Sequence, residues 1–137
     1  MTEHEDVRVA SDFQGSWLVS RLIRHASGAV AKFNGTASWT PVNGGLQYLE
    51  EGQMTVEGHP PLQAERAYFW ADDLTVFFDD GRFFHRVPGK GGAVEHWCDP
   101  DKYVLVYDFA GWPRFKVAWH VTGPRKDYSA DTEYKRC

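Results

Sequence analysis

Apolar and polar residues alternate with a period of two along most of the chain. Ala31, Phe33, Ala37 and Trp39, for example, fall on one face of a segment, while the intervening polar residues fall on the other. This alternation is typical of β-strands, whose successive side chains point to opposite faces of a sheet. No segment shows a helical stripe over three turns, so the pattern predicts little or no helix.

Clusters of Gly, Pro, Asn and Asp interrupt the alternation about every ten residues, which is typical of β-sandwiches and barrels. The pattern predicts strands over residues 15–25, 28–40, 45–57, 63–71, 73–79, 82–87, 92–98, 102–109, 113–122 and 128–136. Every connection is short enough for a hairpin, which favours an antiparallel meander. Because such a sheet must close or bury its edges, we expect an all-β fold: a single antiparallel up-and-down β-barrel of about ten strands, wide enough for a ligand cavity.

Turn chemistry then predicts which residues point inwards. Asp80-Gly81 suits a two-residue type I′ turn, which would pair Phe78 with Phe83 and place both inside with His85.

A second hairpin follows from the segment DPDK, residues 99–102, which suits a type I turn. That turn would pair Cys98 with Tyr103 and His96 with Leu105, with all four side chains inside.

The face of strand 63–71 depends on the length of the turn after it. A three-residue turn places Arg66, Tyr68 and Trp70 inside, whereas a two-residue turn would point them outwards. We favour the first arrangement.

The inward face predicted in this way carries many polar groups. Each unpaired buried polar group costs roughly 1–3 kcal/mol, so these groups either satisfy one another in a network or line a cavity that takes a polar ligand. The residues expected to line a ligand-binding cavity are Arg21, Tyr48, Glu50, Arg66, Tyr68, His85, His96, Cys98, Tyr103, Tyr107, Lys126, Tyr128, Tyr134 and Arg136. Lys126 is expected at the barrel mouth, where it would guide an anion inwards or serve only as a turn residue.

Length and composition fit a single domain. The chain has 137 residues, of which 42% are hydrophobic. We expect residues 1–12 to form a flexible N-terminal tail and residues 13–137 to form the barrel. The net charge of −4 argues against a nucleic-acid partner.

Neither a signal peptide nor a run of about 18 apolar residues stands out, so we expect no membrane association. Two cysteines, Cys98 and Cys137, suit a reducing compartment. The expectation is a cytoplasmic monomer or homodimer that holds a small-molecule ligand and no cofactor.

Five motifs cover nearly the whole chain. They comprise Phe13, Gly15 and Trp17; Gly45, Leu46, Tyr48 and Glu50; Asp80, Gly81, Arg82, Phe84 and His85; His96, Cys98, Asp101 and Tyr103; and Gly123, Pro124, Lys126, Asp127 and Tyr128. With them the sequence resembles the bacterial domain-of-unknown-function family 6314. Its Gly15-Ser16-Trp17 start is similar to that of calycins, the lipocalin and fatty-acid-binding superfamily. The resemblance implies a calycin-like barrel but no established activity. Most calycins hold small apolar or amphipathic molecules, a few are enzymes, and the nitrobindin branch holds haem.

Ligand binding is the first hypothesis. Arg21 and Arg136 lie on the first and last strands, which are neighbours in a closed barrel. Their charges would repel unless an anionic ligand or Glu50 lay between them. The alternative is a purely structural ion-pair network of the same three residues.

Two further hypotheses use the interior His and Cys residues. His85 or His96 could act as a general base with a Tyr as general acid, or Cys98 could form a nucleophile pair with His96, but no catalytic motif supports a particular reaction. The same residues with Glu50 are acceptable metal ligands in type, and haem would need an open axial His. Their spacing matches no recognised zinc pattern, so we expect no metal and lean against an enzyme.

Overall fold

The computed structural model describes residues 7–137, which form ten strands and one short 3-10 helix, η2 (Ala10–Phe13). The strands are β1 (Gly15–His25), β2 (Val30–Val42), β3 (Gly45–Val56), β4 (Leu62–Ala71), β5 (Thr75–Phe78), β6 (Phe83–Arg86), β7 (Gly92–Cys98), β8 (Asp101–Asp108), β9 (Phe115–Thr122) and β10 (Asp127–Arg136).

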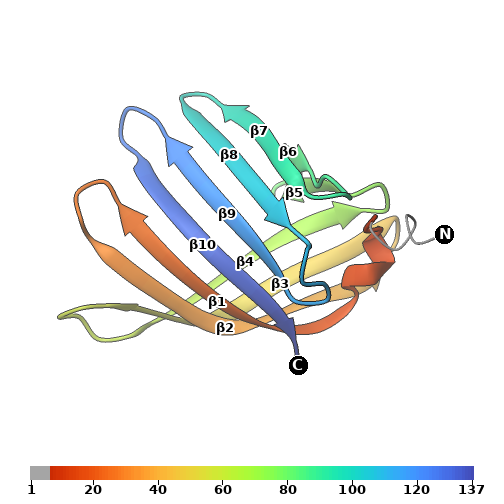
Figure 1. The fold of residues 1–137 in the computed structure, drawn as a ribbon, viewed down its shortest axis with the longest axis horizontal. Helices are drawn as coiled ribbons and strands as arrows, with labels where there is room; N and C mark the ends of the chain where they lie inside the picture. The colour runs from red at the N-terminus through yellow and green to blue at the C-terminus, as the bar shows by residue number, and fades with distance from the viewer. Residues whose placement is uncertain (1–6) are drawn as a thin grey trace.

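The strands form one antiparallel sheet in the order β6-β5-β4-β3-β2-β1-β10-β9-β8-β7. The sheet curls into a nearly closed barrel in which β1 pairs with β10 (Figure 1). The two ends of the sheet, β6 and β7, meet through side chains: the His96 ring lies 5.7 Å from the Phe83 ring and 5.5 Å from the Phe84 ring. The predicted all-β, ten-stranded up-and-down barrel is therefore confirmed.

Burial follows the predicted alternation on the long strands. On β1 the inward residues Trp17, Val19 and Arg21 are buried, whereas their neighbours Leu18 and Ser20 are exposed. On β4, Trp70 is buried and lines the interior with Arg66 and Tyr68, which confirms the favoured face of that strand. Trp70 pairs with Val76, so the register differs from that of a turn at residues 71–73.

The 3-10 helix and the residues around it close one end of the barrel. Phe13 is fully buried, and its ring lies 5.0 Å from Trp70 and 5.2 Å from Trp112. Trp17 donates an indole hydrogen bond to the Phe13 carbonyl oxygen at 2.8 Å.

This closed end extends into the segment predicted as a tail. Residues 1–6 lie outside the described residues. Arg8 and Ala10 are buried, however, and the Arg8 guanidinium lies 4.5 Å from the centre of the Trp112 ring. The packed part of the chain thus begins before residue 13, because apolar and cationic groups of this segment cover the aromatic end of the barrel.

The predicted pairing of Phe78 with Phe83 is wrong. Phe77 pairs with Phe83, and Val76 pairs with His85, so Phe84 is an extra residue in a β-bulge. The bulge turns Phe83 outwards and buries both Phe84 and His85, which a regular strand would place on opposite faces.

The predicted register of the next hairpin is also wrong. Cys98 pairs with Asp101 and His96 with Tyr103, so the loop has two residues rather than four. The expected type I turn placed Asp101 in the loop, whereas in the structure Asp101 is the first residue of β8 and pairs with Cys98. Because the shift is an even number of residues, His96 and Tyr103 keep their predicted face.

A helix long and apolar enough to cross a membrane is absent from residues 7–137.

Candidate functional site

A small polar cavity lies inside the barrel, next to the aromatic closed end. Its volume is about 30 Å³, which is room for about two water molecules. Fifteen residues line it: Arg21, Trp39, Tyr48, Glu50, Arg66, Tyr68, Trp70, Val76, Phe84, His85, Tyr107, Phe115, Val117, Trp119 and Tyr134. Eight of the predicted ligand-binding residues are among them.

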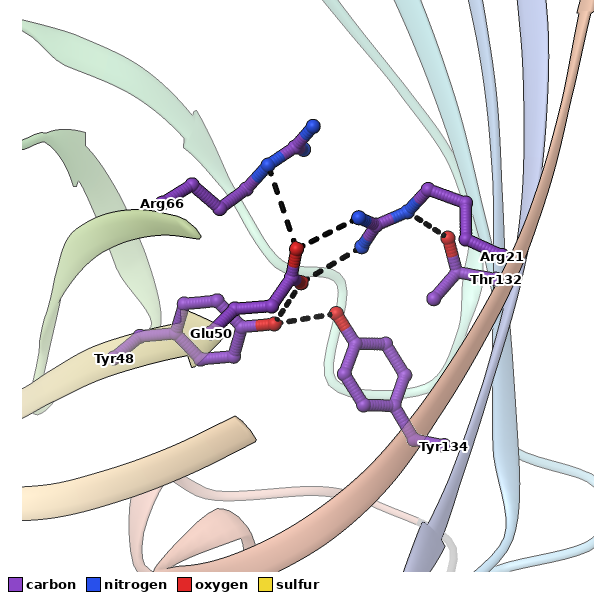
Figure 2. Close-up of polar contacts among 6 residues, drawn as sticks. All are labelled: Arg21, Tyr48, Glu50, Arg66, Thr132 and Tyr134. Atoms are coloured by element: carbon purple, nitrogen blue, oxygen red, sulfur yellow. Dashed lines mark hydrogen bonds and ion pairs between the residues drawn. The ribbon is translucent and has the colours of Figure 1, made fainter. Parts of the chain in front are cut away.

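The Glu50 carboxylate is the centre of the cavity's hydrogen bonds (Figure 2). Arg21 donates to it through both terminal nitrogens, Nη1 to Oε2 at 2.7 Å and Nη2 to Oε1 at 2.8 Å. Tyr48 donates its hydroxyl to Oε1 at 2.5 Å and lies 3.0 Å from the Tyr134 hydroxyl. Arg21 also donates from Nε to the Thr132 hydroxyl at 2.8 Å.

Alternation and register bring these groups together. Glu50 on β3 pairs with Arg66 on β4, and Arg21 on β1 pairs with Thr132 on β10. Directly paired residues on neighbouring strands point to the same face of the sheet. Glu50 therefore lies beside Arg66, and Arg21 lies beside Thr132, on the inner face.

Burial and charge act against each other in this network. Burial alone would raise the pKa of Glu50, but the hydrogen bonds and charge of Arg21, with the charge of Arg66, outweigh burial and hold that pKa below its ordinary value. Burial, with the nearby Glu50 charge, raises the pKa of Tyr134 to about 12. Glu50 is therefore ionised and Tyr134 neutral at physiological pH.

Arg66 is the less completely paired of the two arginines. Its Nε lies 3.6 Å from Glu50 Oε2, and its side chain is 36% exposed. Figure 2 shows it on the opposite side of the carboxylate from Arg21. Its guanidinium carbon lies 5.6 Å from the centre of the Trp119 ring. Among the residues that the structure describes, two guanidinium groups face one carboxylate, which gives the cavity one excess positive charge.

His85 contributes no charge to this balance. Its Nε2 lies 2.8 Å from the Tyr107 hydroxyl, and the side chain is 3% exposed. Burial, with the nearby His96, lowers the pKa of His85 to about 3. Within residues 7–137, its Nδ1 and the Trp39 Nε1 are buried without a hydrogen-bond partner.

Five of the predicted ligand-binding residues do not line the cavity and lie nearer the other end of the barrel, away from η2. We call this end the open end. They are His96, Cys98, Tyr103, Lys126 and Tyr128. Lys126 forms an ion pair with Asp101 at 3.1 Å, because the turn before β10 lies beside the turn before β8. Its position there fits the predicted barrel mouth.

The predicted anion site between Arg21 and Arg136 is wrong. Arg136 lies at the closed end, where it donates to the backbone carbonyls of Gln14 at 2.7 Å and Asp12 at 2.6 Å. It pairs with Trp17, four residues along β1 from Arg21. Arg21 is neutralised by Glu50 instead, as the ion-pair alternative anticipated for these two residues, but Arg136 is not part of that network.

The sequence prediction missed mainly the apolar walls of the cavity. Alternation groups Trp39 with other apolar residues on one face, but only polar residues were selected as candidates, so Trp39, Phe115, Val117 and Trp119 were left out. Phe84 was missed because the bulge has no clear signal in the alternation.

Metal ligation finds no support in this geometry. No group of three His, Cys, Asp or Glu side chains in the described part of the chain could hold a metal ion. His96 and Cys98 lie on β7, while His85 and Glu50 lie on β6 and β3.

The fold and the cavity define a calycin-like, nearly closed antiparallel barrel whose largely apolar interior encloses a few charged and polar groups. Residues 13–136 match the model of a family described as "Family of unknown function (DUF6314)", and the chain belongs to that family.

A similar solved structure is the S-type phycobiliprotein lyase CPES from Guillardia theta, with a TM-score of 0.67 and 9% sequence identity. The match covers 100% of this chain and 98% of that chain. At this identity the likeness shows a shared fold. A comparison with curated protein sequences finds no match.

Proposed function

We propose that the barrel binds a small amphipathic anion, with its negative group on Arg66 and its apolar part against Trp119. The observation that carries the proposal is the excess positive charge of the cavity. Glu50 supplies one negative charge for two guanidinium groups, and Arg66, the less completely paired of the two, is reachable from solvent.

Arg66 is better suited than Arg21 to receive the ligand. Arg21 uses Nη1, Nη2 and Nε in hydrogen bonds to Glu50 and Thr132. Arg66 makes one long contact to Glu50 through Nε at 3.6 Å, and its guanidinium also interacts with the Tyr68 hydroxyl. Its partial exposure gives an anion a route to the guanidinium donors, which match the planar fork of a carboxylate.

The surroundings of Arg66 suit the apolar part of such a ligand. Trp119 lies beneath the guanidinium, and Tyr68 and Phe84 stand beside it in the cavity wall. The cavity holds only a few atoms, so a longer apolar part would extend to the open end, where Tyr103 and Trp119 are half-buried. This combination of apolar walls with few polar groups is typical of small-molecule sites.

Catalysis at His85 is the weaker candidate. The fold occurs in a protein named a phycobiliprotein lyase, and His85 contacts Tyr107 inside the cavity. A general base works best with a pKa near the operating pH, however, and that of His85 is lowered to about 3.

Calorimetry with matched six-carbon probes tests the proposal. Hexanoate should bind, whereas hexanol and hexylammonium should bind at least tenfold more weakly. Arg66→Gln should weaken hexanoate binding by about ten- to a hundredfold, as expected for a hydrogen bond to a charged group of about 1.5–3 kcal/mol.

Arg24→Gln is the matched control, because Arg24 pairs with Asp131 in an exposed ion pair. Equal binding of the acid and the amine, or equal losses in the two variants, would contradict the proposal.

A further inference from the structure

Two buried nitrogen atoms in the cavity lack hydrogen-bond partners, and both belong to its lining. Trp39 is 2% exposed and His85 is 3% exposed, and within residues 7–137 neither Trp39 Nε1 nor His85 Nδ1 has a partner. An unsatisfied buried polar group is costly, and its presence calls for an explanation. Both residues line the same cavity as Arg66, the residue of the proposed anion site.

The chemical character of the Trp39 atom is fixed, because an indole Nε1–H can only donate. The character of the His85 atom depends on its tautomer. His85 is neutral at physiological pH, so one ring nitrogen carries a proton and the other accepts.

The contact with Tyr107 decides between the two tautomers. If Tyr107 donates to Nε2 at 2.8 Å, one group remains unsatisfied, the Nδ1–H. If Nε2–H donates to Tyr107 instead, both the Tyr107 proton and the Nδ1 lone pair lack partners. The first arrangement satisfies more of the buried groups and is therefore favoured. Both orphan atoms are then donors.

We infer that His85 and Trp39 form an acceptor subsite, which selects ligands that carry an uncharged carbonyl oxygen in addition to their negative group. The inference rests on the proposed function and names its ligand class as short oxo-carboxylates. Arg66 receives the carboxylate, while the two N–H groups receive the carbonyl. The closed network around Glu50 separates the two roles, because its hydrogen bonds already use Arg21, Tyr48 and Tyr134.

The first test needs no ligand. Nitrogen-15 NMR of the His85 ring reads its tautomer and charge directly. The inference predicts a neutral ring between pH 5 and 8 with the proton on Nδ1. A proton on Nε2, or a charged ring at pH 7, would overturn it.

The second test compares hexanoate with 3-, 4- and 5-oxohexanoate. At least one oxo isomer should bind about tenfold more tightly than hexanoate, and Trp39→Phe should remove that preference. The indole proton signal of Trp39 should shift when this isomer binds. Trp17, whose indole already donates to Phe13, is the internal reference and should not respond.

A conservative exchange at His85 separates hydrogen bonding from packing. His85→Asn keeps an N–H near the position of Nδ1 and should retain part of the oxo preference, whereas His85→Leu should lose it. If either His85 variant fails to fold, the Trp39→Phe result and the tautomer decide the question.

The outcomes separate this inference from the proposed function. If hexanoate binds through Arg66 and no oxo isomer binds more tightly, His85 and Trp39 do not recognise a ligand carbonyl. The inference is then wrong, while the proposed function stands. If no carboxylate binds at all, the proposed function fails, and the oxo-carboxylate class fails with it.

Discussion

The closed end of the barrel and the cavity beside it are both built from inward-facing positions of the strands. They differ in whether their polar groups have hydrogen-bond partners. At the closed end, the indole of Trp17 and the guanidinium of Arg136 both donate to backbone carbonyls. In the cavity, Trp39 and His85 keep unsatisfied nitrogens, and Arg66 is only partly paired.

The difference separates a part of the interior whose polar groups are largely satisfied from the part where we propose that a ligand binds. Satisfied polar groups and packed rings stabilise the closed end, although the buried Arg8 Nε is an exception. Within the described residues the cavity keeps unpaired polar atoms and a long ion pair, a pattern that is typical of functional sites. The predictions below separate stability from binding.

Truncation at the closed end should have the largest effect on stability. Trp17→Ala removes a fully buried ring that contacts Trp39 and Phe115. We expect a loss of about 3–5 kcal/mol in the free energy of unfolding, measured by urea denaturation. Trp97→Ala is the control, because Trp97 is 62% exposed, and it should change stability by less than about 0.5 kcal/mol. Similar losses in the two variants would contradict the assignment.

Breaking the buried ion pair should come next. Glu50→Gln leaves the Arg21 charge buried without its carboxylate and should cost about 3 kcal/mol in urea denaturation. Adding Arg21→Met should recover much of that loss, because the uncompensated charge is removed. A double variant less stable than the single one would show that the cost lies elsewhere.

Acid should weaken the fold through His85. Its pKa is about 3 in the folded chain and about 6.5 when unfolded, so only the unfolded chain gains a proton between these values. Stability from this group is complete above pH 6.5 and falls as the pH drops, by about 2 kcal/mol at pH 5. Glu50, whose pKa is lowered, adds a loss at more acidic pH. Denaturation curves of wild type and His85→Asn between pH 5 and 8 measure the His85 contribution, and parallel pH dependences would refute it.

Neutralising Arg66 should have the smallest effect on stability. Because the side chain is partly exposed and its contact to Glu50 is long, Arg66→Gln should cost less than about 1 kcal/mol in urea denaturation. A loss as large as that of Glu50→Gln would mean that Arg66 serves the fold rather than a ligand.

The sequence predicted the sheet well because period-two alternation is strong on β1 to β3 and on β9 and β10. It placed Arg21, Glu50, Tyr48 and Tyr134 on one interior surface, where they form the observed network.

What it could not predict depends on local backbone geometry or on position along a strand. The bulge at Phe84 shifts one register, and the two-residue loop before Asp101 shifts another. Alternation also gives the face of Arg136 but not its depth in the barrel, and that depth separates it from Arg21. The unsatisfied nitrogens of Trp39 and His85 depend on distances in three dimensions, which residue patterns do not contain.

The most direct measurement of the central claim is NMR chemical-shift mapping of the labelled protein during a hexanoate titration. Binding at the cavity predicts that the guanidinium signal of Arg66 and the indole signal of Trp119 shift together, with one dissociation constant, while Arg24 on the outer face stays unchanged. Saturable shifts that avoid Arg66 and Trp119, or that follow Arg24, would contradict the claim.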